Sequence, residues 1–319
     1  MISHKEIHTI GICGLGQMGA AAAVSFKRAG YCVLAWDQDQ AQLAAITKRS
    51  RELEIWLDEH GSPPLRPGGS IEAVTGPGSL DKEASIIMDC IYEDQAQKVD
   101  LFKSFPGLKS RGGLFITTTS GLSITDMGRL SGIGPLLTGA HFWNPPHLMP
   151  LVEVIRGEET LDSVFETIVS LIDSIGKLPI RVNIDVPGFI GNRMLHALWR
   201  EAISLVEKGI ADPNDIDLVA KLTFGLRLPV LGPIENMDIV GLDLIERIHD
   251  YLLEDIADNH QPSPLLRDMV RQGQRGLKDE RGFYDWGSRD AETLLDKRDK
   301  QILHQLAYIA ELERMKDEG

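Results

Sequence analysis

The chain has 319 residues, of which 43% are hydrophobic and 25% charged. This composition is typical of a soluble folded protein and excludes a disordered or collagen-like chain. With 33 Lys and Arg against 47 Asp and Glu, the net charge is −14, which repels a nucleic-acid backbone or an anionic membrane. We therefore expect neither as a partner. A chain longer than about 250–300 residues favours two domains.

The cysteines and the first residues favour a reducing compartment. Three Cys are too few and too odd in number for a disulfide framework. Cys13, Cys32 and Cys90 each lie in an apolar run, so we expect three small buried thiols. The first residues lead directly into a strand-like segment without the apolar stretch of a signal peptide, and no window approaches about 18 uninterrupted apolar residues. We expect a cytoplasmic protein.

In the first half of the chain, short apolar runs alternate with helical patterns. Strands are predicted at residues 8–13, 32–36, 85–91, 114–118 and 179–182, and helices at residues 17–29, 39–59 and 94–105. This alternation favours a mostly parallel sheet with helices on its faces. Residues 61–79 are rich in Pro and Gly, and we interpret them as a connection within the same domain.

Beyond residue 182 the pattern becomes helical. Apolar residues recur with a helical period over residues 188–208, 214–224, 236–258 and 264–272. A charged tail from about residue 287 carries Leu295, Ile302, Leu306 and Ile309 at helical spacing, which predicts a final amphipathic helix. Because Pro187 and Gly188 mark the change of pattern, we divide the chain into domains 1–184 and 185–319.

A glycine-rich segment follows the first predicted strand and opens the first predicted helix. It reads Gly14-Leu15-Gly16-Gln17-Met18-Gly19. Gly14 permits a tight turn, Gly16 lets a pyrophosphate approach the backbone, and Gly19 lets the helix pack closely on the strand. The alternative is a plain strand-to-helix turn. We favour an α/β fold, with a Rossmann-type nucleotide-binding domain followed by an all-helical C-terminal domain.

Asp37 ends the second predicted strand, 18 residues after Gly19. A carboxylate at this position accepts hydrogen bonds from the adenosine ribose, and its charge disfavours a ribose phosphate, so we predict NAD as the cofactor rather than NADP. The alternative role for Asp37 is a cap of the following helix, for which Asp39 competes.

His141 and Glu153 lie in two apolar segments that read as strands. Oxidation of an alcohol by NAD needs a base for the hydroxyl proton, and a neutral His suits this role. A carboxylate on the other ring nitrogen would fix the tautomer of the imidazole. Glu153 can do so if the two strands pair side by side. The alternative is a structural histidine among aromatic residues.

Three motifs then carry a resemblance. They are Thr119-Ser120-Gly121-Leu122-Ser123-Ile124, the segment HFWNPPHLMPLVEVI from His141 to Ile155, and DVPGFIGNR from Asp185 to Arg193. In this order and at these spacings they resemble the L-3-hydroxyacyl-CoA dehydrogenase family, over about the first 285 residues.

The resemblance implies roles for individual residues. It makes His141 the general base, Glu153 its orienting carboxylate, and Ser120 and Asn192 the groups that hydrogen-bond the substrate oxygen. It places Glu93 and Lys98 at the nicotinamide end of the cofactor, although either can also be an ordinary solvated charge. A small-molecule substrate and a homodimer formed through the helical half are further implications of the resemblance.

Two departures from the family pattern bear on the substrate. The chain has Thr117-Thr118-Thr119-Ser120-Gly121 where acyl-CoA members usually have Ser-Asn-Thr-Ser-Ser, which changes the floor of the pocket. Its NPP sequence at Asn144, with a Pro before Leu151, is similar to a branch that acts on free acids. That branch includes the gulonate 3-dehydrogenases, or lambda-crystallin, and a dehydrogenase of pyridine carboxylates.

The preferred substrate is therefore a small hydroxy-carboxylate of the 3-hydroxy acid type. Arg193, Arg227 and His147 are the candidates to pair with its carboxylate, Arg227 first. The second candidate substrate is a short L-3-hydroxyacyl-CoA, whose phosphates would meet the cations Lys48, Arg49 and Arg51 unless these form only a solvated helix face.

Two more alternatives stay open: an aldehyde on a ring carboxylate, oxidised as its hydrate, and a non-catalytic NAD-binding or structural protein. Retention of Ser120, His141, Glu153 and Asn192 together argues against the second. His196, His249 and His260 have no metal-ligand spacing around them, so no metal is predicted.

Overall fold

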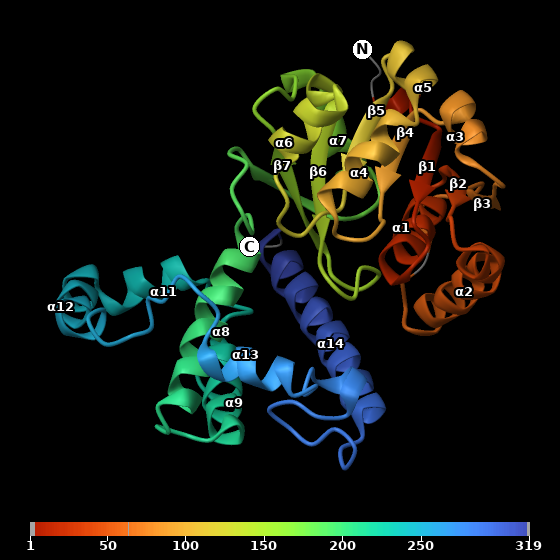
Figure 1. Cartoon of the computed structure of the whole chain (residues 1–319). Coiled ribbons are helices and arrows are strands. Elements are labelled where there is room, and N and C mark those ends of the chain that lie inside the picture. Colours follow the sequence, from red (N-terminus) through yellow and green to blue (C-terminus); the bar gives the residue numbers. More distant parts are fainter. Residues whose placement is uncertain (1–3, 63, 318–319) are drawn as a thin grey trace. The chain divides into compact units, whose positions relative to one another are not determined.

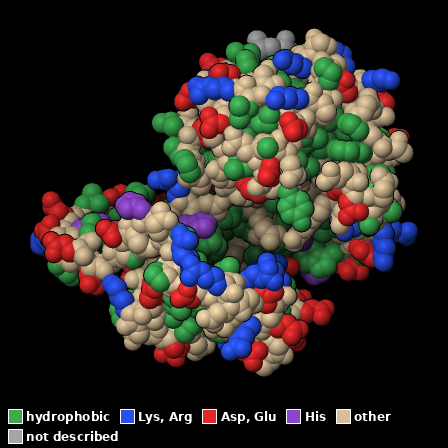
Figure 2. Space-filling view, viewed as in Figure 1, with side chains coloured by type: hydrophobic (Ala, Val, Ile, Leu, Met, Phe, Trp, Pro, Cys, Tyr) green, Lys and Arg blue, Asp and Glu red, His purple; other side chains and the backbone are tan. Residues whose placement is uncertain are grey.

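The computed structural model describes residues 4–62 and 64–317. The chain divides into two compact units, Met1–Arg193 and Met194–Gly319 (Figure 1). Acidic and basic side chains are interspersed over the visible face of the molecule (Figure 2). None of the helices in the described ranges is long and apolar enough to cross a membrane.

The first unit is built on one eight-stranded sheet with the order β3-β2-β1-β4-β5-β6-β7-β8. All neighbouring strands are parallel except β6 and β7, which are antiparallel. The strands are β1 (Thr9–Cys13), β2 (Cys32–Trp36), β3 (Ser70–Ala73), β4 (Ile86–Asp89), β5 (Leu114–Thr117), β6 (Leu137–Phe142), β7 (Leu151–Arg156) and β8 (Leu178–Val182). The central strands are buried and mostly apolar because both of their faces are covered.

Helices bury both faces of this sheet, in two apolar clusters. Residues of α1, α2 and α7 pack in one cluster, and residues of α3, α4, α5 and α6 in the other. Their bounds are α1 (Gln17–Arg28), α2 (Gln40–Glu59), α3 (Pro77–Glu83), α4 (Gln95–Lys103), α5 (Pro106–Ser110), α6 (Ile124–Ser131) and α7 (Asp162–Ser174), with short 3-10 helices η1 (His4–Glu6) and η2 (Gly134–Leu136). The predicted α/β Rossmann-type domain is confirmed.

The second unit is helical, as predicted. Its helices are α8 (Gly191–Glu207, which begins at the end of the first unit), α9 (Pro213–Leu222), α10 (Phe224–Arg227), α11 (Pro233–Val240), α12 (Leu242–Leu252), α13 (Pro264–Arg271), the 3-10 helix η3 (Leu277–Asp279) and α14 (Ala291–Asp317). The single helix predicted over residues 236–258 was wrong. Gly241 separates α11 from α12 because its φ of 103° lies outside the helical region, in a conformation that favours glycine.

The prediction of three buried cysteines also needs a correction. Cys13 is buried and Cys90 is partly buried, but Cys32 is exposed. Cys32 is the first residue of β2, where the burial of the strand has not yet begun. Burial raises the pKa of the Cys90 thiol to about 12 and that of Cys13 well above its ordinary value, so both stay protonated at neutral pH.

Candidate active site

The three glycines of the loop between β1 and α1 have different structural roles. Gly14 has a φ of 94°, and a Cβ there would lie 2.5 Å from the carbonyl oxygen of Cys90. A Cβ on Gly19 would lie 1.8 Å from the carbonyl oxygen of Gly14, so this residue lets α1 start close to the strand. Gly16 has no atom within 4 Å of such a Cβ. Open space thus lies over Gly16, at the N-terminus of α1, where a phosphate is favoured.

Asp37 closes the other side of this loop. Its Oδ2 accepts a hydrogen bond from the backbone N–H of Leu15 at 2.6 Å, and its Oδ1 accepts one from Asp39 at 2.8 Å. The cap of α2 is Asp39, whose side chain accepts from the N–H of Ala41. The capping role considered for Asp37 therefore belongs to Asp39, and Asp37 ties the end of β2 to the glycine loop.

A cleft of about 720 Å³ opens beside this loop, at the carboxyl ends of β1, β2 and β4. It is lined by Gly14, Gly16, Gln17, Met18, Trp36, Asp37, Gln38, Asp39, Gln42, Pro77, Cys90, Ile91, Tyr92, Gln97, Asp100, Leu101 and Ser104. The residues fit a dinucleotide: an open glycine at a helix N-terminus for the pyrophosphate and a carboxylate beside it for the ribose.

Arg49 reaches this loop from α2. Its Nη1 donates to the carbonyl oxygen of Leu15 and, at 3.0 Å, to Oε1 of Gln42. Lys48, by contrast, is exposed and pairs with Glu52 on its own helix. Arg49 therefore supports the glycine loop. It is not part of a solvated helix face, and its guanidinium is already engaged when a CoA phosphate would need it. The helical spacing alone gave no sign of this contact.

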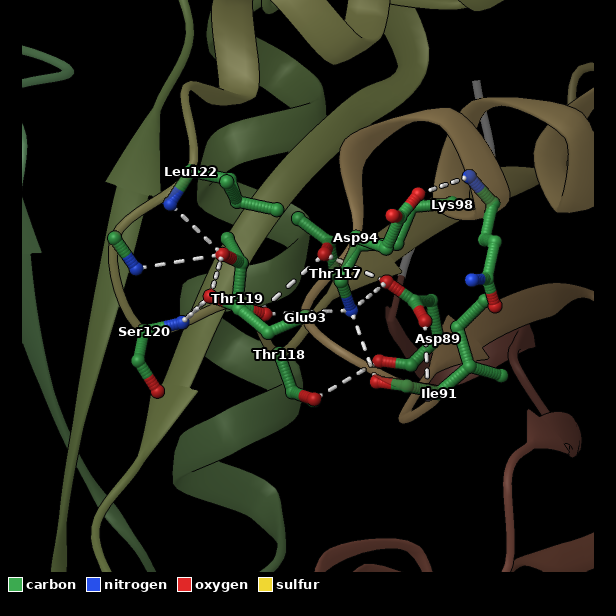
Figure 3. A network of polar contacts seen from close by, with 12 residues as sticks. Asp89, Ile91, Glu93, Asp94, Lys98, Thr117, Thr118, Thr119, Ser120 and Leu122 are labelled. Atoms are coloured by element: carbon green, nitrogen blue, oxygen red, sulfur yellow. Dashed lines mark hydrogen bonds and ion pairs between the residues drawn. The ribbon is translucent and has the colours of Figure 1, made fainter. Parts of the chain in front are cut away.

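A polar network fills the space between the ends of β4 and β5 (Figure 3). Asp89 is fully buried, and its carboxylate accepts from Lys98 Nζ at 2.8 Å, Thr117 Oγ1 at 2.8 Å and the N–H of Ile91 at 3.0 Å. Burial raises the pKa of Asp89, and the Lys98 ammonium opposes that rise. Lys98 is only 1% exposed, so the alternative of an ordinary solvated charge was wrong for this residue.

Glu93 joins this network to the segment that carries Ser120. Its Oε1 accepts from the N–H of Ser120 at 2.8 Å and from Thr119 Oγ1 at 2.5 Å. Its Oε2 lies 3.7 Å from Lys98 Nζ. Figure 3 shows the backbone nitrogen of Ser120 turned toward Glu93 and its hydroxyl turned away. The Ser120 hydroxyl is therefore left available for another partner.

His141 and Glu153 are directly paired across β6 and β7. His141 Nδ1 lies 2.8 Å from Glu153 Oε2, and the two residues are 4% and 2% exposed. The other oxygen of Glu153 accepts from the N–H groups of Ile190 at 2.9 Å and Gly191 at 3.0 Å. Burial acts to raise the pKa of Glu153, but these hydrogen bonds outweigh it and hold the pKa below its ordinary value.

A tight turn before α8 delivers those two backbone donors. Gly188 and Phe189 both have positive φ, 77° and 51°, and Phe189 donates its N–H to the carbonyl oxygen of Val186. For a bulky residue such as Phe189 this conformation is strained, and strain of this kind gathers at functional sites. Asn192 follows, and its Nδ2 donates to the backbone oxygen of Ser120 at 2.9 Å. The first unit thus brings Ser120, His141, Glu153 and Asn192 together.

The three residues predicted to pair with a substrate carboxylate do not cluster within one unit of the structure. Arg193 donates to the carbonyl oxygen of Pro187, and the His147 ring meets Trp56 edge-on at 5.4 Å. Arg227 is exposed on α10 in the second unit. Within residues 4–62 and 64–317, no group of three or more His, Cys, Asp and Glu is placed to hold a metal ion.

The sequence pattern also missed Lys177, which directly precedes β8. The side chain is buried, and its Nζ donates to the carbonyl oxygens of Pro146 and Met149, both at 2.8 Å. Burial lowers the pKa of Lys177 to about 8. The ammonium thereby fixes the loop that follows His141. An isolated Lys before a strand gives no sequence signal for such a role.

Comparisons with known proteins cover nearly the whole chain. The family model for the NAD-binding domain of 3-hydroxyacyl-CoA dehydrogenase matches residues 9–186, and the model for its C-terminal domain matches residues 188–286. A 5-formyl-3-hydroxy-2-methylpyridine 4-carboxylate 5-dehydrogenase from Mesorhizobium japonicum is 31% identical over 93% of this chain and 96% of its own. A probable 3-hydroxybutyryl-CoA dehydrogenase from Deinococcus radiodurans is 35% identical over 86% of this chain and 99% of its own.

One solved structure is similar in shape over nearly the whole chain. It is a 5-formyl-3-hydroxy-2-methylpyridine 4-carboxylic acid 5-dehydrogenase, described as an NAD+ dependent dismutase. It superposes with a TM-score of 0.90 at 30% identity and covers 95% of this chain and 99% of its own. That coverage exceeds the span of the two family models, so the likeness extends into α14.

Proposed function

The chain belongs to the 3-hydroxyacyl-CoA dehydrogenase family and is an NAD-dependent oxidoreductase acting on CH–OH groups, and from this premise we propose that its substrate is a small free carboxylate. The reacting group is an alcohol, or an aldehyde that reacts as its hydrate. The observation that carries the chemistry is the buried pair of His141 and Glu153, with one imidazole nitrogen held by the carboxylate.

His141 acts as the general base in this proposal. With Nδ1 held by Glu153, its Nε2 is the atom that accepts the hydroxyl proton. Bound NAD supplies the hydride acceptor. The depressed pKa of Glu153 keeps that carboxylate charged, so it stabilises the imidazolium that forms. Ser120 and Asn192 bind the substrate oxygen as its charge changes.

We assign the cofactor to the cleft beside the glycine loop. The loop from Gly14 to Gly19 receives the pyrophosphate, with Gly14, Gly16, Gln17 and Met18 lining the cleft and Leu15 and Gly19 buried behind them, and Asp37 accepts from the adenosine ribose. We place Glu93 at the nicotinamide end, with a carboxylate that is accessible because its side chain is 45% exposed. Lys98 is buried beneath it, and we propose that it supports Glu93 rather than touching the cofactor directly.

A substrate without CoA is favoured by two observations. Arg49 is committed to the glycine loop, so one of the three cations considered for a CoA phosphate is already engaged. The relative that acts on a pyridine carboxylate matches more of this chain than the probable 3-hydroxybutyryl-CoA dehydrogenase does, 93% against 86%. A short L-3-hydroxyacyl-CoA remains the second candidate because the latter relative has the higher identity, 35%.

The test is NADH formation by the wild type on a matched panel. It contains L-3-hydroxybutyryl-CoA, L-3-hydroxybutyrate, L-gulonate, L-carnitine and a hydroxymethylpyridine carboxylate, with Arg227→Gln measured alongside. We expect turnover of at least one free acid and none of the thioester. Turnover of the thioester alone contradicts the proposal. If Arg227 binds the carboxylate, its loss raises KM for free acids only.

We also propose that the chain forms a homodimer through the second unit. None of the residues in α8 to α13 is buried within one chain. Large apolar side chains are exposed there, including Leu222, Leu226, Ile234, Ile239, Leu242 and Tyr251. A second copy is the partner that covers such a surface symmetrically. Sedimentation equilibrium tests this proposal, and a monomer at micromolar concentration contradicts it.

A further inference from the structure

Trp143 occupies a gap left by a glycine at the active site. A Cβ on Gly191 would lie 2.2 Å from Cζ2 of Trp143 and 2.9 Å from its Cη2. Gly191 is not among the glycines with positive φ, so its backbone conformation does not require glycine. The absence of a side chain at position 191 is therefore explained by the indole that fills the space.

The same indole contacts the proposed base. The ring centroids of His141 and Trp143 are 5.1 Å apart with an interplanar angle of 61°. Phe189 lies against the imidazole as well, with centroids 5.7 Å apart. Phe189 is 1% exposed, whereas Trp143 is only partly buried. Of the two aromatic rings on His141, Trp143 is thus the one with surface left for a ligand.

A substrate must approach closely to give its proton to His141. The base is 4% exposed, so only a small part of its ring can be reached. A ligand there lies next to the indole, whose flat face suits another flat ring. A flexible saturated chain gains less from such a wall because it must lose rotamer freedom to lie along it.

We propose that Trp143, seated against Gly191, is a specificity-determining residue that selects a planar aromatic carboxylate over an aliphatic hydroxy acid. The substrate class is a pyridine- or benzene-type ring that carries a carboxylate and an adjacent hydroxymethyl or formyl group. This inference rests on the proposed function and narrows it. In the hydrate of the formyl group, the carbon loses hydride to NAD and one hydroxyl gives its proton to His141, which leaves a carboxylic acid. That acid then releases its remaining proton to solvent and becomes a second carboxylate.

The test compares two substrates in three variants. The substrates are 5-formyl-3-hydroxy-2-methylpyridine 4-carboxylate and L-3-hydroxybutyrate. Trp143→Leu removes the ring, and Trp143→Phe keeps a smaller one. Trp199→Phe is the matched control. Trp199 also meets an imidazole edge-on, that of His196 at 4.9 Å, and it lies seven residues beyond Asn192 on α8.

We expect Trp143→Leu to lower kcat/KM for the pyridine substrate by about tenfold, the upper range for an aromatic pair, and that for L-3-hydroxybutyrate by less than about threefold. Trp143→Phe falls between the wild type and Trp143→Leu. The pH profile of kcat/KM keeps its wild-type shape, since His141 and Glu153 remain. An equal loss on both substrates, or a shifted pH profile, overturns the proposal because Trp143 would then only support the imidazole.

The glycine is tested separately. Gly191→Ala places a methyl group inside the indole ring position, so we expect it to reduce activity strongly in the wild type and only slightly in Trp143→Leu. Equal effects in both backgrounds contradict the pairing. The proposed function fails in a different way: the wild type would then reduce NAD with L-3-hydroxybutyryl-CoA and with neither free acid, whatever residue 143 is.

Discussion

The two units of this chain differ in how they use their apolar residues. The first buries them in two clusters on either side of the sheet, and it also buries charged groups such as Asp89, Lys98 and Glu153. The second buries none of the residues in α8 to α13 and leaves many large apolar side chains exposed. A single chain therefore completes the core of the first unit but not that of the second.

The two units therefore have different expected roles: the first holds the proposed catalytic residues, and the second provides the surface for association. Each of the four residues that we place at the reacting atoms lies in the first unit, and each is held by hydrogen bonds within it. The polar contacts in the described part of the second unit are at most partly buried, as for Tyr284 with Asp217. Substitutions in the first unit should then affect catalysis or its folding. Substitutions in the second should affect helix geometry and association, with Arg227 as the exception that is tested for substrate binding.

The largest expected effect is that of His141→Ala. Removal of a general base costs about 10²–10⁴-fold in kcat. We expect this loss with unchanged NAD affinity, because His141 is not among the residues that line the cofactor cleft. The measurement is NADH formation together with NAD binding by calorimetry. If His141 is a structural residue instead, kcat stays within about threefold of the wild type and the proposed base is wrong.

The next effect concerns the stability of the first unit. Lys98→Met leaves Asp89 buried without its cation, and breaking a buried ion pair from one side costs about 3–5 kcal/mol. We expect this loss in urea denaturation followed in the first unit. Lys103→Met is the matched control, since Lys103 is exposed on the same helix.

A double variant separates stability from positioning. Asp89→Asn with Lys98→Met removes both charges, so much of the lost stability should return. If the double variant is as unstable as Lys98→Met, the ion pair is not the cause of the loss. Activity that stays low in a stable double variant would show that the pair also holds Glu93 and Ser120 in place.

Local patterns predicted the parts of the fold that depend on local sequence. The glycine loop follows from a strand, three glycines and a helix in immediate succession, and each glycine is placed as that motif requires. The pairing of His141 with Glu153 required only that two adjacent apolar segments form neighbouring strands. The observed register puts the two residues directly opposite each other.

The sequence could not predict features that depend on contacts between residues far apart in the chain. Lys98 reads as a surface charge in its helix, and its burial depends on Asp89 at the end of β4. Arg49 likewise reads as part of a basic helix face, although it reaches the carbonyl oxygen of Leu15. Periodicity finds the apolar side of a helix but does not tell which charged residue meets a partner from another element.

Lys177 offers a pH-dependent test within the first unit. Its pKa is about 8 in the folded chain and 10.5 when unperturbed, so the unfolded state binds more protons between these pH values. Stability should therefore rise as pH increases from about 8 to 10.5, by up to roughly 3 kcal/mol. A neutral amine still donates to Pro146 and Met149, so the loop stays fixed. Urea denaturation at several pH values measures this rise.

The control is Lys177→Met, in which that rise should disappear. Lys103→Met retains it, because an exposed ammonium has no burial to relieve. A wild type whose stability is flat across this range would show that the two carbonyl oxygens stabilise the ammonium enough to offset its burial.

The smallest expected effect is the change in stability caused by Gly241→Ala in the second unit. Its sign tells whether residues 236–258 form one helix or the two helices α11 and α12. If residues 236–258 formed one helix, Gly241→Ala would stabilise the protein by about 0.5–1 kcal/mol, since glycine is unfavourable inside a helix. With φ at 103°, an alanine is strained, and we expect a loss of about 1–2 kcal/mol. Gly287→Ala, whose added Cβ meets nothing closer than 3.4 Å, should change stability by less than about 0.5 kcal/mol. Thermal unfolding of the three proteins gives the sign, and a gain for Gly241→Ala would mean that α11 and α12 are one helix.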